Sequence, residues 1–322
     1  MQEGSCHTTC THVTCHVDRW HICAIARTCL RAVHLSSSSS SYIYIHIYIY
    51  GHKYKFFWTG CKEGSSGVGI LVAEKWLEKV VEVKRVNERL MLVRLTVGVR
   101  VVNIVSAYAP QAGRPYVEKE EFWFSMTKLL SGVGVEESVF VCGDMNGHVG
   151  CDPAGFESEH GGNGFGKRNT EGEMLLEFAM AMELIVCNTF YTKDESKKIT
   201  YESGDSKSEI DYILARRKER SVVRDVTTIS GEACATQHKL LSCKIELSPF
   251  QPTNAFGALK TYVRHDLTFI VVSCLFVNNF NFIYLINYLI LLLLFYYFNF
   301  ILKISSSRVF INHVWKGVHW DG

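Results

Sequence analysis

An aspartate and an asparagine two residues apart are the side chains of this sequence best suited to chemistry on phosphates. Asp144 and Asn146 lie in the hexapeptide Gly-Asp-Met-Asn-Gly-His at 143–148, directly after the apolar run 139–142. Side chains alternate along a strand, so residues i and i+2 are expected to face one cavity. The carboxylate can take up a proton or help to hold a metal, and the amide can orient a water or a phosphate oxygen. Alone, Asp-x-Asn is equally typical of an ordinary strand-end turn, since both residues favour loops.

Three further side chains fit the same chemistry. Tyr108 ends the apolar run before Pro110, and its hydroxyl is expected at the rim of the site, where it can donate to a phosphate oxygen. Asp211 lies inside the apolar run 210–214, where a charge is costly unless it is paired. His238 precedes the last predicted strand, and a carboxylate beside a histidine sets its tautomer and stabilises the imidazolium. We therefore expect Asp211 to orient His238, and His238 to face the scissile phosphate.

Hydrophobic periodicity predicts the elements that position these side chains. Helical spacing predicts helices at 117–130 and 171–184, and Thr170 with Glu173 has the spacing of a capping box at the second. Period-two or short apolar runs predict strands at 68–72, 80–86, 90–97, 101–108, 139–142, 184–188, 199–202, 209–215, 222–229 and 240–247. Many strands with two helices between them predict an α/β sandwich on mixed or antiparallel sheets, and not a doubly wound parallel sheet.

Composition divides the 322 residues into distinct regions. The whole chain is 48% hydrophobic and 20% charged, and its formal net charge of +2 predicts no partner. Only one region reads as an ordinary globular domain. The predicted divisions are 1–53, unassigned and of low complexity; 54–247, the globular domain; 248–266, a linker; 267–302, an uncharged apolar segment; and 303–322, a tail.

The apolar segment 267–302 is longer than the roughly 20 apolar residues that a helix needs to cross a bilayer. One interpretation is a transmembrane helix, which would place the protein at a membrane. The interpretation that we favour is that both flanks are translated non-coding DNA, because the Tyr-Ile alternation at 42–50 is what a TATATA repeat encodes. The start of the chain has no basic and apolar stretch typical of a signal peptide.

Four polar residues outside the catalytic motifs are candidate DNA contacts. Lys197 and Lys198 lie in one predicted loop, and Arg168 and Asn169 lie in the loop that follows the Asp144 strand. Basic side chains in such loops can bind phosphates and make binding dependent on salt. The alternative for the lysines is a solvated charged face.

The order of these motifs resembles the endonuclease/exonuclease/phosphatase superfamily, most closely the endonuclease domain of non-LTR (LINE-type) retrotransposons. Ser-Ala-Tyr-Ala-Pro, Gly-Asp-Met-Asn-Gly, Ile-Asp-Tyr and Gln-His occur in that order, and the resemblance covers roughly 54–247. Four longer blocks carry the closer match, at 68–72, 83–91, 143–150 and 164–172.

The resemblance implies a DNase I-like four-layer α/β sandwich that hydrolyses DNA phosphodiesters with Mg²⁺ or Mn²⁺, in the nucleus or the cytoplasm. Asp144 would activate the attacking water or handle the leaving-group proton, and Asn146 would orient the phosphate. Tyr108 would donate a hydrogen bond to the phosphate. Asp211 would orient His238, which would stabilise the developing charge. DNA is the expected partner, and no protein partner is predicted.

Two departures from the family pattern lead us to expect impaired activity. The family domain begins with a strand bearing an Asn and a second strand ending in Gln-Glu, whose Glu is the main metal ligand, and neither precedes Tyr54. Glu3 of Met-Gln-Glu at 1–3 is the candidate for that ligand. Gln237 replaces an acidic residue that many members carry before the histidine. The alternatives are a catalytically inactive nucleic-acid-binding remnant and a phosphatase on the same scaffold.

Overall fold

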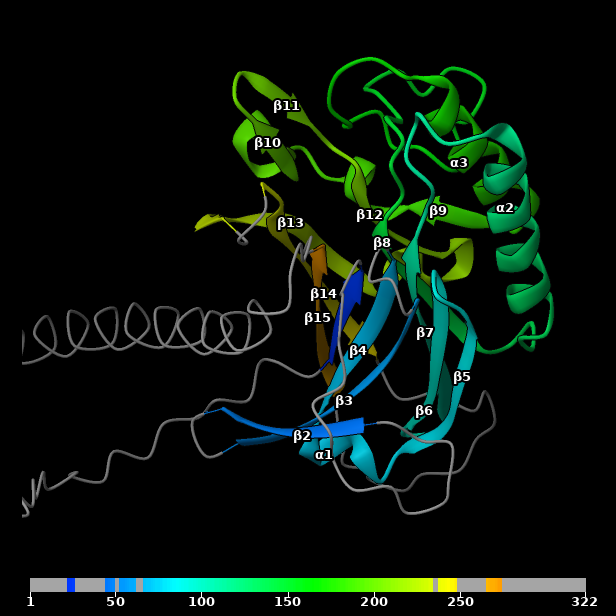
Figure 1. The fold of residues 1–322 in the computed structure, drawn as a ribbon, viewed down its shortest axis with the longest axis vertical. Coiled ribbons are helices and arrows are strands. Elements are labelled where there is room, and N and C mark those ends of the chain that lie inside the picture. The colour runs from blue at the N-terminus through cyan, green and yellow to red at the C-terminus, as the bar shows by residue number, and fades with distance from the viewer. Residues whose placement is uncertain are drawn as a thin grey trace, which may run out of the picture.

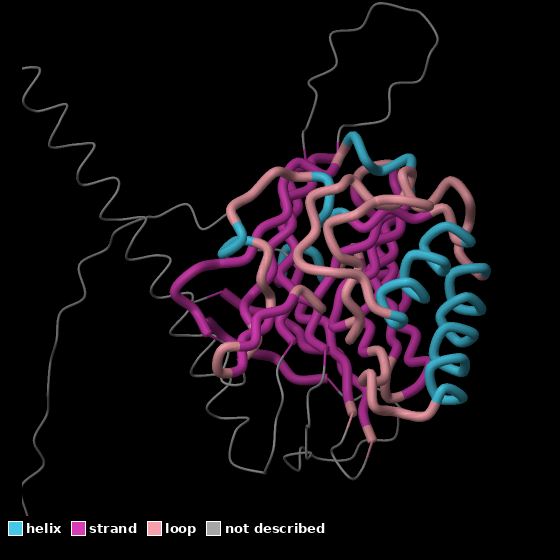
Figure 2. The backbone as a smooth tube through the Cα atoms, turned by 90° about the horizontal axis from the view of Figure 1, so that it is seen from above, coloured by secondary structure: helices cyan, strands magenta, loops and turns pink. Residues whose placement is uncertain are grey.

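Two β-sheets pack face to face, and two helices cover the outer face of one of them (Figures 1 and 2). This arrangement is seen in a computed structural model of the chain. It describes residues 22–26, 44–49, 52–61, 66–233, 237–247 and 265–273, with side chains described for 54–61, 66–229 and 237–247. The predicted α/β sandwich is confirmed.

The six-stranded sheet has the order β5-β6-β7-β8-β12-β9. Its strands β7 and β8 are parallel, because helix α2 (Tyr116–Ser131) makes the crossover between them, and its other pairs are antiparallel. The carboxyl ends of β7 and β8 therefore meet the amino end of β12. The strand bounds are β5 (Val80–Asn87), β6 (Leu90–Val97), β7 (Arg100–Tyr108), β8 (Ser138–Asp144), β9 (Leu184–Val186) and β12 (Asp211–Arg216).

The seven-stranded sheet has the order β13-β14-β15-β1-β4-β3-β2. Three of its strands come wholly from outside 54–247: β1 (Ile22–Ala26), β2 (Tyr44–Ile49) and β15 (His265–Ser273). β1 and β15 lie side by side between β4 and β14, so segments far apart in the chain complete the middle of this sheet. The other bounds are β3 (His52–Gly60), β4 (Gly67–Ala73), β13 (Val223–Ala233) and β14 (Lys239–Leu247).

Alternation along the strands of the six-stranded sheet divides the core into two layers. On β8, Phe140 and Cys142 face the seven-stranded sheet, whereas Val139 and Val141 face helices α2 and α3. Burial of these apolar faces is the main favourable term in holding the layers together. The remaining elements are short: α1 (Glu74–Leu77), η1 (Cys187–Phe190), η2 (Glu195–Lys197), η3 (Arg217–Ser221) and the hairpin β10 (Tyr201–Ser203) with β11 (Ser206–Ser208).

Helix α3 (Thr170–Ala181) is capped by Asn169, and the predicted Thr170 capping box is wrong. The Asn169 side-chain oxygen accepts a hydrogen bond of 2.8 Å from the Gly172 amide. Asn precedes Thr among N-cap residues, so the helix begins at Thr170 with its cap one position earlier than predicted. The helix also ends sooner than predicted, because Leu184 begins strand β9.

The predicted transmembrane helix at 267–302 is wrong. In the part of the chain that the structure describes, no helix is long and apolar enough to span a membrane. The first residues of the segment belong to β15, which pairs antiparallel with β14 and parallel with β1. Thr268 and the residues at 270–272 are β-branched and suit this pairing, so the first residues of the segment were misread as part of a helix. The rest of the segment, 274–302, lies outside the described residues.

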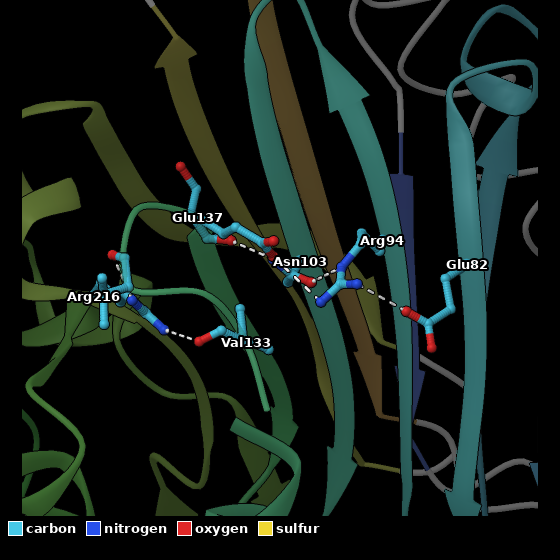
Figure 3. Close-up of polar contacts among 8 residues, drawn as sticks. Glu82, Arg94, Asn103, Val133, Glu137 and Arg216 are labelled. Carbon is cyan, nitrogen blue, oxygen red and sulfur yellow. Dashed lines mark hydrogen bonds and ion pairs between the residues drawn. The ribbon is translucent and has the colours of Figure 1, made fainter. Parts of the chain in front are cut away.

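A polar network holds the end of the six-stranded sheet that lies away from Asp144 (Figure 3). Asn103 is fully buried, and its side chain accepts from Arg94 Nε at 3.1 Å and donates to Glu137 Oε2 at 2.7 Å. Arg94 Nη1 in turn lies 3.1 Å from Glu82 Oε2. The buried amide is therefore satisfied, and the network links β5, β6 and β7 on the side of the sheet that faces the helices.

Candidate active site

Three polar side chains form a row across the six-stranded sheet. Asp144, the last residue of β8, pairs in register with Tyr108 of β7 and with Asp211 of β12. Residues paired across strands point to the same face, and this face is directed toward the seven-stranded sheet. All three residues are at most 2% exposed. The register thus brings together groups that are more than 100 positions apart in sequence, from 108 to 211.

His238 reaches this row from the opposite sheet. It lies just before β14, and its Nδ1 is 3.0 Å from Asp211 Oδ2, as expected from the sequence. The two side chains are 2% and 1% exposed, so the pair lies in surroundings where charge is poorly screened. With Nδ1 donating to Asp211, Nε2 is the nitrogen that can exchange a proton with a bound group.

Asn146 lies beside Asp144 through a turn and not through strand alternation. β8 ends at Asp144, and Asn146 has a positive φ of 48°. Its backbone amide donates to Asp144 Oδ1 at 2.9 Å, and its Nδ2 donates to the Ala109 carbonyl at 2.8 Å. Asn tolerates this left-handed conformation, and its side chain is the more exposed of the pair. The expected pairing of the two residues is present, but its cause is the turn.

Tyr108 is buried, at 2% exposure, and does not lie at an open rim as expected. The Arg89 guanidinium lies 4.9 Å from the centre of its ring, and Arg89 Nη1 donates to the Tyr108 carbonyl at 3.3 Å. Arg89 therefore brings a positive charge next to Tyr108, the member of the row on β7. Arg89 lies within the block 83–91, but sequence reasoning gave it no role, because it lies in the turn between β5 and β6 and outside the catalytic motifs.

The described residues do not by themselves fit a divalent cation. In the ranges described above, no group of three or more His, Cys, Asp or Glu side chains is placed to hold a metal ion. One oxygen of Asp211 is engaged by His238, and one oxygen of Asp144 accepts from the Asn146 amide. Glu3, the predicted metal ligand, lies outside the described residues.

The predicted DNA contacts Arg168 and Asn169 hold the glycine-rich loop 147–166. The Arg168 guanidinium donates to the carbonyls of Asp152 and Ala154 and lies over the Phe156 ring. The Asn169 oxygen accepts from the His148 amide at 2.8 Å in addition to capping α3. Both side chains thus have structural partners, and their contact with DNA stays a prediction.

The predicted lysine contacts lie in and beside η2. Lys197 is the last residue of η2, and Lys198 follows it; both side chains are partly exposed. The positive charge of Lys198 acts to lower the pKa of Glu209, against the larger rise caused by burial. Their contact with DNA is likewise untested.

Residues 200–203 brace the segment that carries His238, and sequence reasoning missed them. The Tyr201 ring packs edge-on against His238, with 4.9 Å between ring centres. Its hydroxyl donates to Gln237 Oε1 at 2.8 Å, and Gln237 Nε2 donates to Ser203 Oγ at 2.7 Å. Thr200 Oγ1 accepts the backbone amide of Asp211 at 3.1 Å. No local pattern indicates these contacts, because those between Gln237 and residues 201–203 join positions more than 30 residues apart and that of Thr200 spans 11.

His160 closes the glycine-rich loop and makes its stability depend on pH. It is 1% exposed; its Nε2 lies 3.0 Å from the Gly150 carbonyl, and its Nδ1 accepts the Gly162 amide at 3.0 Å. Burial lowers its pKa below the usual 6.5. The unfolded chain therefore binds the proton more readily, and this contribution to stability is lost as the pH falls below 6.5.

We accordingly expect the melting temperature of the wild type to fall more steeply between pH 7.5 and 5 than that of His160→Gln, which lacks the titrating ring. Thermal melting followed by circular dichroism over that range measures the difference. Parallel pH curves for the two proteins would contradict the assignment.

Two curated proteins match the sequence. Craniofacial development protein 2 of Bos taurus is 29% identical over 203 residues, which cover 59% of this chain and 33% of that protein. The protein of the same name from Tragulus javanicus is 27% identical over 203 residues, covering 59% and 34%. The chain thus spans about a third of the length of the curated relatives it matches. No protein-family model matches it.

Solved structures of nucleases resemble the fold. The endonuclease domain of TRAS1, a telomere-specific non-LTR retrotransposon, has a TM-score of 0.43 and 12% identity, covering 58% of this chain and 75% of that one. The AP endonuclease LMAP from Leishmania major has a TM-score of 0.45 and 12% identity, covering 58% and 68%. An AP endonuclease from Archaeoglobus fulgidus has a TM-score of 0.44 and 16% identity, covering 58% and 77%.

Proposed function

We propose that this chain, which resembles the endonuclease/exonuclease/phosphatase superfamily and is similar to craniofacial development protein 2, hydrolyses phosphodiester bonds in DNA. The observation that carries the proposal is the His238–Asp211 pair, with 3.0 Å between Nδ1 and Oδ2, beside Asp144. A histidine paired with a carboxylate next to a second carboxylate is an arrangement for proton transfer and charge stabilisation at a reacting phosphate.

Each member of the site has a distinct part in the proposed reaction. Asn146 is the more exposed residue and orients the incoming phosphate through its amide. Asp144 takes the proton of the attacking water or returns it to the leaving oxygen. Asp211 keeps His238 in one orientation, so that its ring stabilises the charge on the phosphate. Tyr108 donates to a phosphate oxygen.

Mg²⁺ or Mn²⁺ is the proposed cofactor, on the resemblance alone. A hard divalent cation prefers carboxylate oxygens and phosphates and would neutralise the charge that develops on the phosphate. The described residues supply too few ligands for it. This shortage favours a second candidate function, a nucleic-acid-binding remnant that keeps the fold without turnover.

Incubation of the purified chain with supercoiled plasmid and Mg²⁺ distinguishes the two candidates. We expect nicking by the wild type, its loss with a chelator, and a rate about a hundredfold lower in Asp144→Ala, in line with the loss of one general acid–base group. The matched control is Glu136→Ala, which removes a carboxylate whose side chain is 96% exposed, just before the opposite end of β8.

Two results would decide against the enzyme. Wild-type protein that leaves the plasmid supercoiled, with no more affinity for Mg²⁺ than Asp144→Ala, supports the remnant. Nicking that survives in Asp144→Ala at the Glu136→Ala rate places the chemistry elsewhere or in a contaminant.

A further inference from the structure

Another buried carboxylate, in addition to those of Asp144 and Asp211, lies two residues before Asp211. Glu209 is 2% exposed and precedes strand β12 by two residues. Its Oε1 accepts from Asn188 Nδ2 at 3.0 Å, and its Oε2 accepts from the backbone amide of Phe165 at 3.0 Å. Both oxygens of the carboxylate are thus committed to N–H donors from two different segments. The proposed reaction assigns no part to this group.

Asn188 acts as a continuation of strand β9 along the edge of β12. β9 ends at Val186, opposite Leu214, and the chain then turns into η1. The Asn188 side chain takes over the ladder: its Oδ1 accepts the Ile213 amide at 3.1 Å, and its Nδ2 donates to the Asp211 carbonyl at 3.1 Å. The backbone on both sides of Tyr212, from the Asp211 carbonyl to the Ile213 amide, is therefore held by one amide group, and that amide donates to Glu209.

The same carboxylate ties the glycine-rich loop 147–166 to the amino end of β12. Phe165, near the end of the loop, donates its amide to Glu209. A parallel tie runs through Tyr212, whose hydroxyl donates to the Glu209 carbonyl at 2.6 Å and accepts the Val149 amide at 3.3 Å. Two points of the loop that follows Asp144 and Asn146 are thereby joined to the segment that carries Asp211.

We propose that Glu209 is a positioning residue, which through Asn188 holds Asp211 in place for His238 and couples the glycine-rich loop to that pair. The inference rests on the proposed function for its catalytic consequence. Its geometric content stands on the contacts of Glu209 alone. If the Glu209–Asn188 hydrogen bond is lost, the backbone beside Asp211 can move, and the Asp211 carboxylate that orients the imidazole moves with it. A small displacement of a catalytic group lowers the turnover rate more than substrate binding.

The raised pKa of Glu209 is consistent with its role as a positioning residue. Burial raises its pKa to about 7; the charged or titratable groups that face it are Lys198, which lowers the pKa, Asp211, which raises it, and the Tyr212 hydroxyl. Only the ionised carboxylate accepts both N–H groups, because protonation places a hydrogen on one oxygen. The pKa of Glu209 in the folded chain lies above the usual 4.5, so the unfolded chain releases this proton first. The free energy of unfolding therefore decreases as the pH rises from 4.5 to about 7. The chain therefore keeps a costly charge where the network requires an acceptor.

The test uses the full chain with Glu209→Gln, which keeps the shape but presents an NH₂ group to one of the two donors. The matched control is Glu219→Gln, a carboxylate that is also 2% exposed and bonded, to Ser138 and Arg100, at the far end of the sheet. Two readouts are compared: kcat and KM for plasmid nicking, and NMR of the His238 ring together with hydrogen exchange of the Phe165 amide. Glu209→Asp, which keeps the charge on a shorter side chain, replaces Glu209→Gln if that variant does not fold.

We expect Glu209→Gln to lower kcat about tenfold with KM within about twofold, a change equivalent to one hydrogen bond. The His238 ring resonances shift and the Phe165 amide exchanges faster. Glu219→Gln is expected to change none of these, although both variants lose stability. The proposal would be overturned if Glu209→Gln kept the His238 resonances and the Phe165 exchange rate of the wild type. It would also be overturned if Glu219→Gln changed them to the same extent. If the wild type does not nick DNA, the proposed function fails, and the NMR readout alone decides the positioning role.

Discussion

Replacing His238 by Gln is expected to lower the rate of plasmid nicking by about a thousandfold, within the range for loss of a group that stabilises charge on the reacting atoms. His238 reaches the row of Tyr108, Asp144 and Asp211 from the seven-stranded sheet, and a neutral Gln at this place can donate a hydrogen bond but cannot carry the positive charge of an imidazolium. Initial rates of conversion from supercoiled to nicked plasmid measure the effect. A rate within about tenfold of the wild type would remove His238 from the proposed reaction.

The same substitution is expected to weaken the fold, and a second variant separates the two effects. Without the imidazole, the Asp211 carboxylate, which is 1% exposed, loses the hydrogen bond from His238 Nδ1, and the loss of one hydrogen bond to a buried charged group costs about 3 kcal/mol. His238→Gln combined with Asp211→Asn replaces the pair by two neutral amides and should recover much of that stability. Nicking should stay lost in the double variant. Recovery of activity together with stability would show that the single variant failed by unfolding.

Replacing Gly143 by Ala is expected to reduce the free energy of unfolding by about 3 kcal/mol or more, because a backbone neighbour leaves no room for the methyl group. A Cβ at Gly143 would lie 1.8 Å from the Ala107 carbonyl oxygen, across the parallel pair of β7 and β8. The two strands would have to separate beside Asp144 and Tyr108. The variant therefore tests how closely the register of these strands is tied to the site.

Urea unfolding of Gly143→Ala and of Gly113→Ala provides the measurement. A Cβ at Gly113 meets no atom within 4 Å, so that variant should stay within about 0.5 kcal/mol of the wild type. A Gly143→Ala midpoint equal to that of Gly113→Ala would mean that the strands accommodate the methyl group, and the close approach would then not be a constraint.

Local patterns predicted the globular part of the fold well. The helix expected at 117–130 is α2 (Tyr116–Ser131), and the strands expected at 90–97 and 101–108 are β6 and β7 within a residue. These elements have strong periodicity, and periodicity is a property of neighbouring residues. The cap of α3 was misassigned because Asn169 and Thr170 are both good caps, and the choice depends on the chain path before the helix.

The apolar segment after 267 shows where local patterns fail. Hydropathy alone cannot tell part of a membrane helix from an apolar strand, since both are rich in uncharged apolar residues. Strand β15 forms because it pairs with β1 and β14. β14 lies about 20 positions before it, whereas β1 lies near the other end of the chain. Partners at such distances leave no trace in a window of 20 residues.

The sequence by itself determined which groups can act: Asp144 with Asn146 after a buried strand, an aspartate in the apolar run 210–214, and a histidine before the last strand. Only the tertiary structure decided that they meet. Asp211 and His238 are 27 positions apart and belong to different sheets, so their contact depends on how the two sheets pack. The tertiary structure also decided that Glu209 joins them, because the partners of a buried carboxylate are set by which N–H groups the folded chain brings within reach.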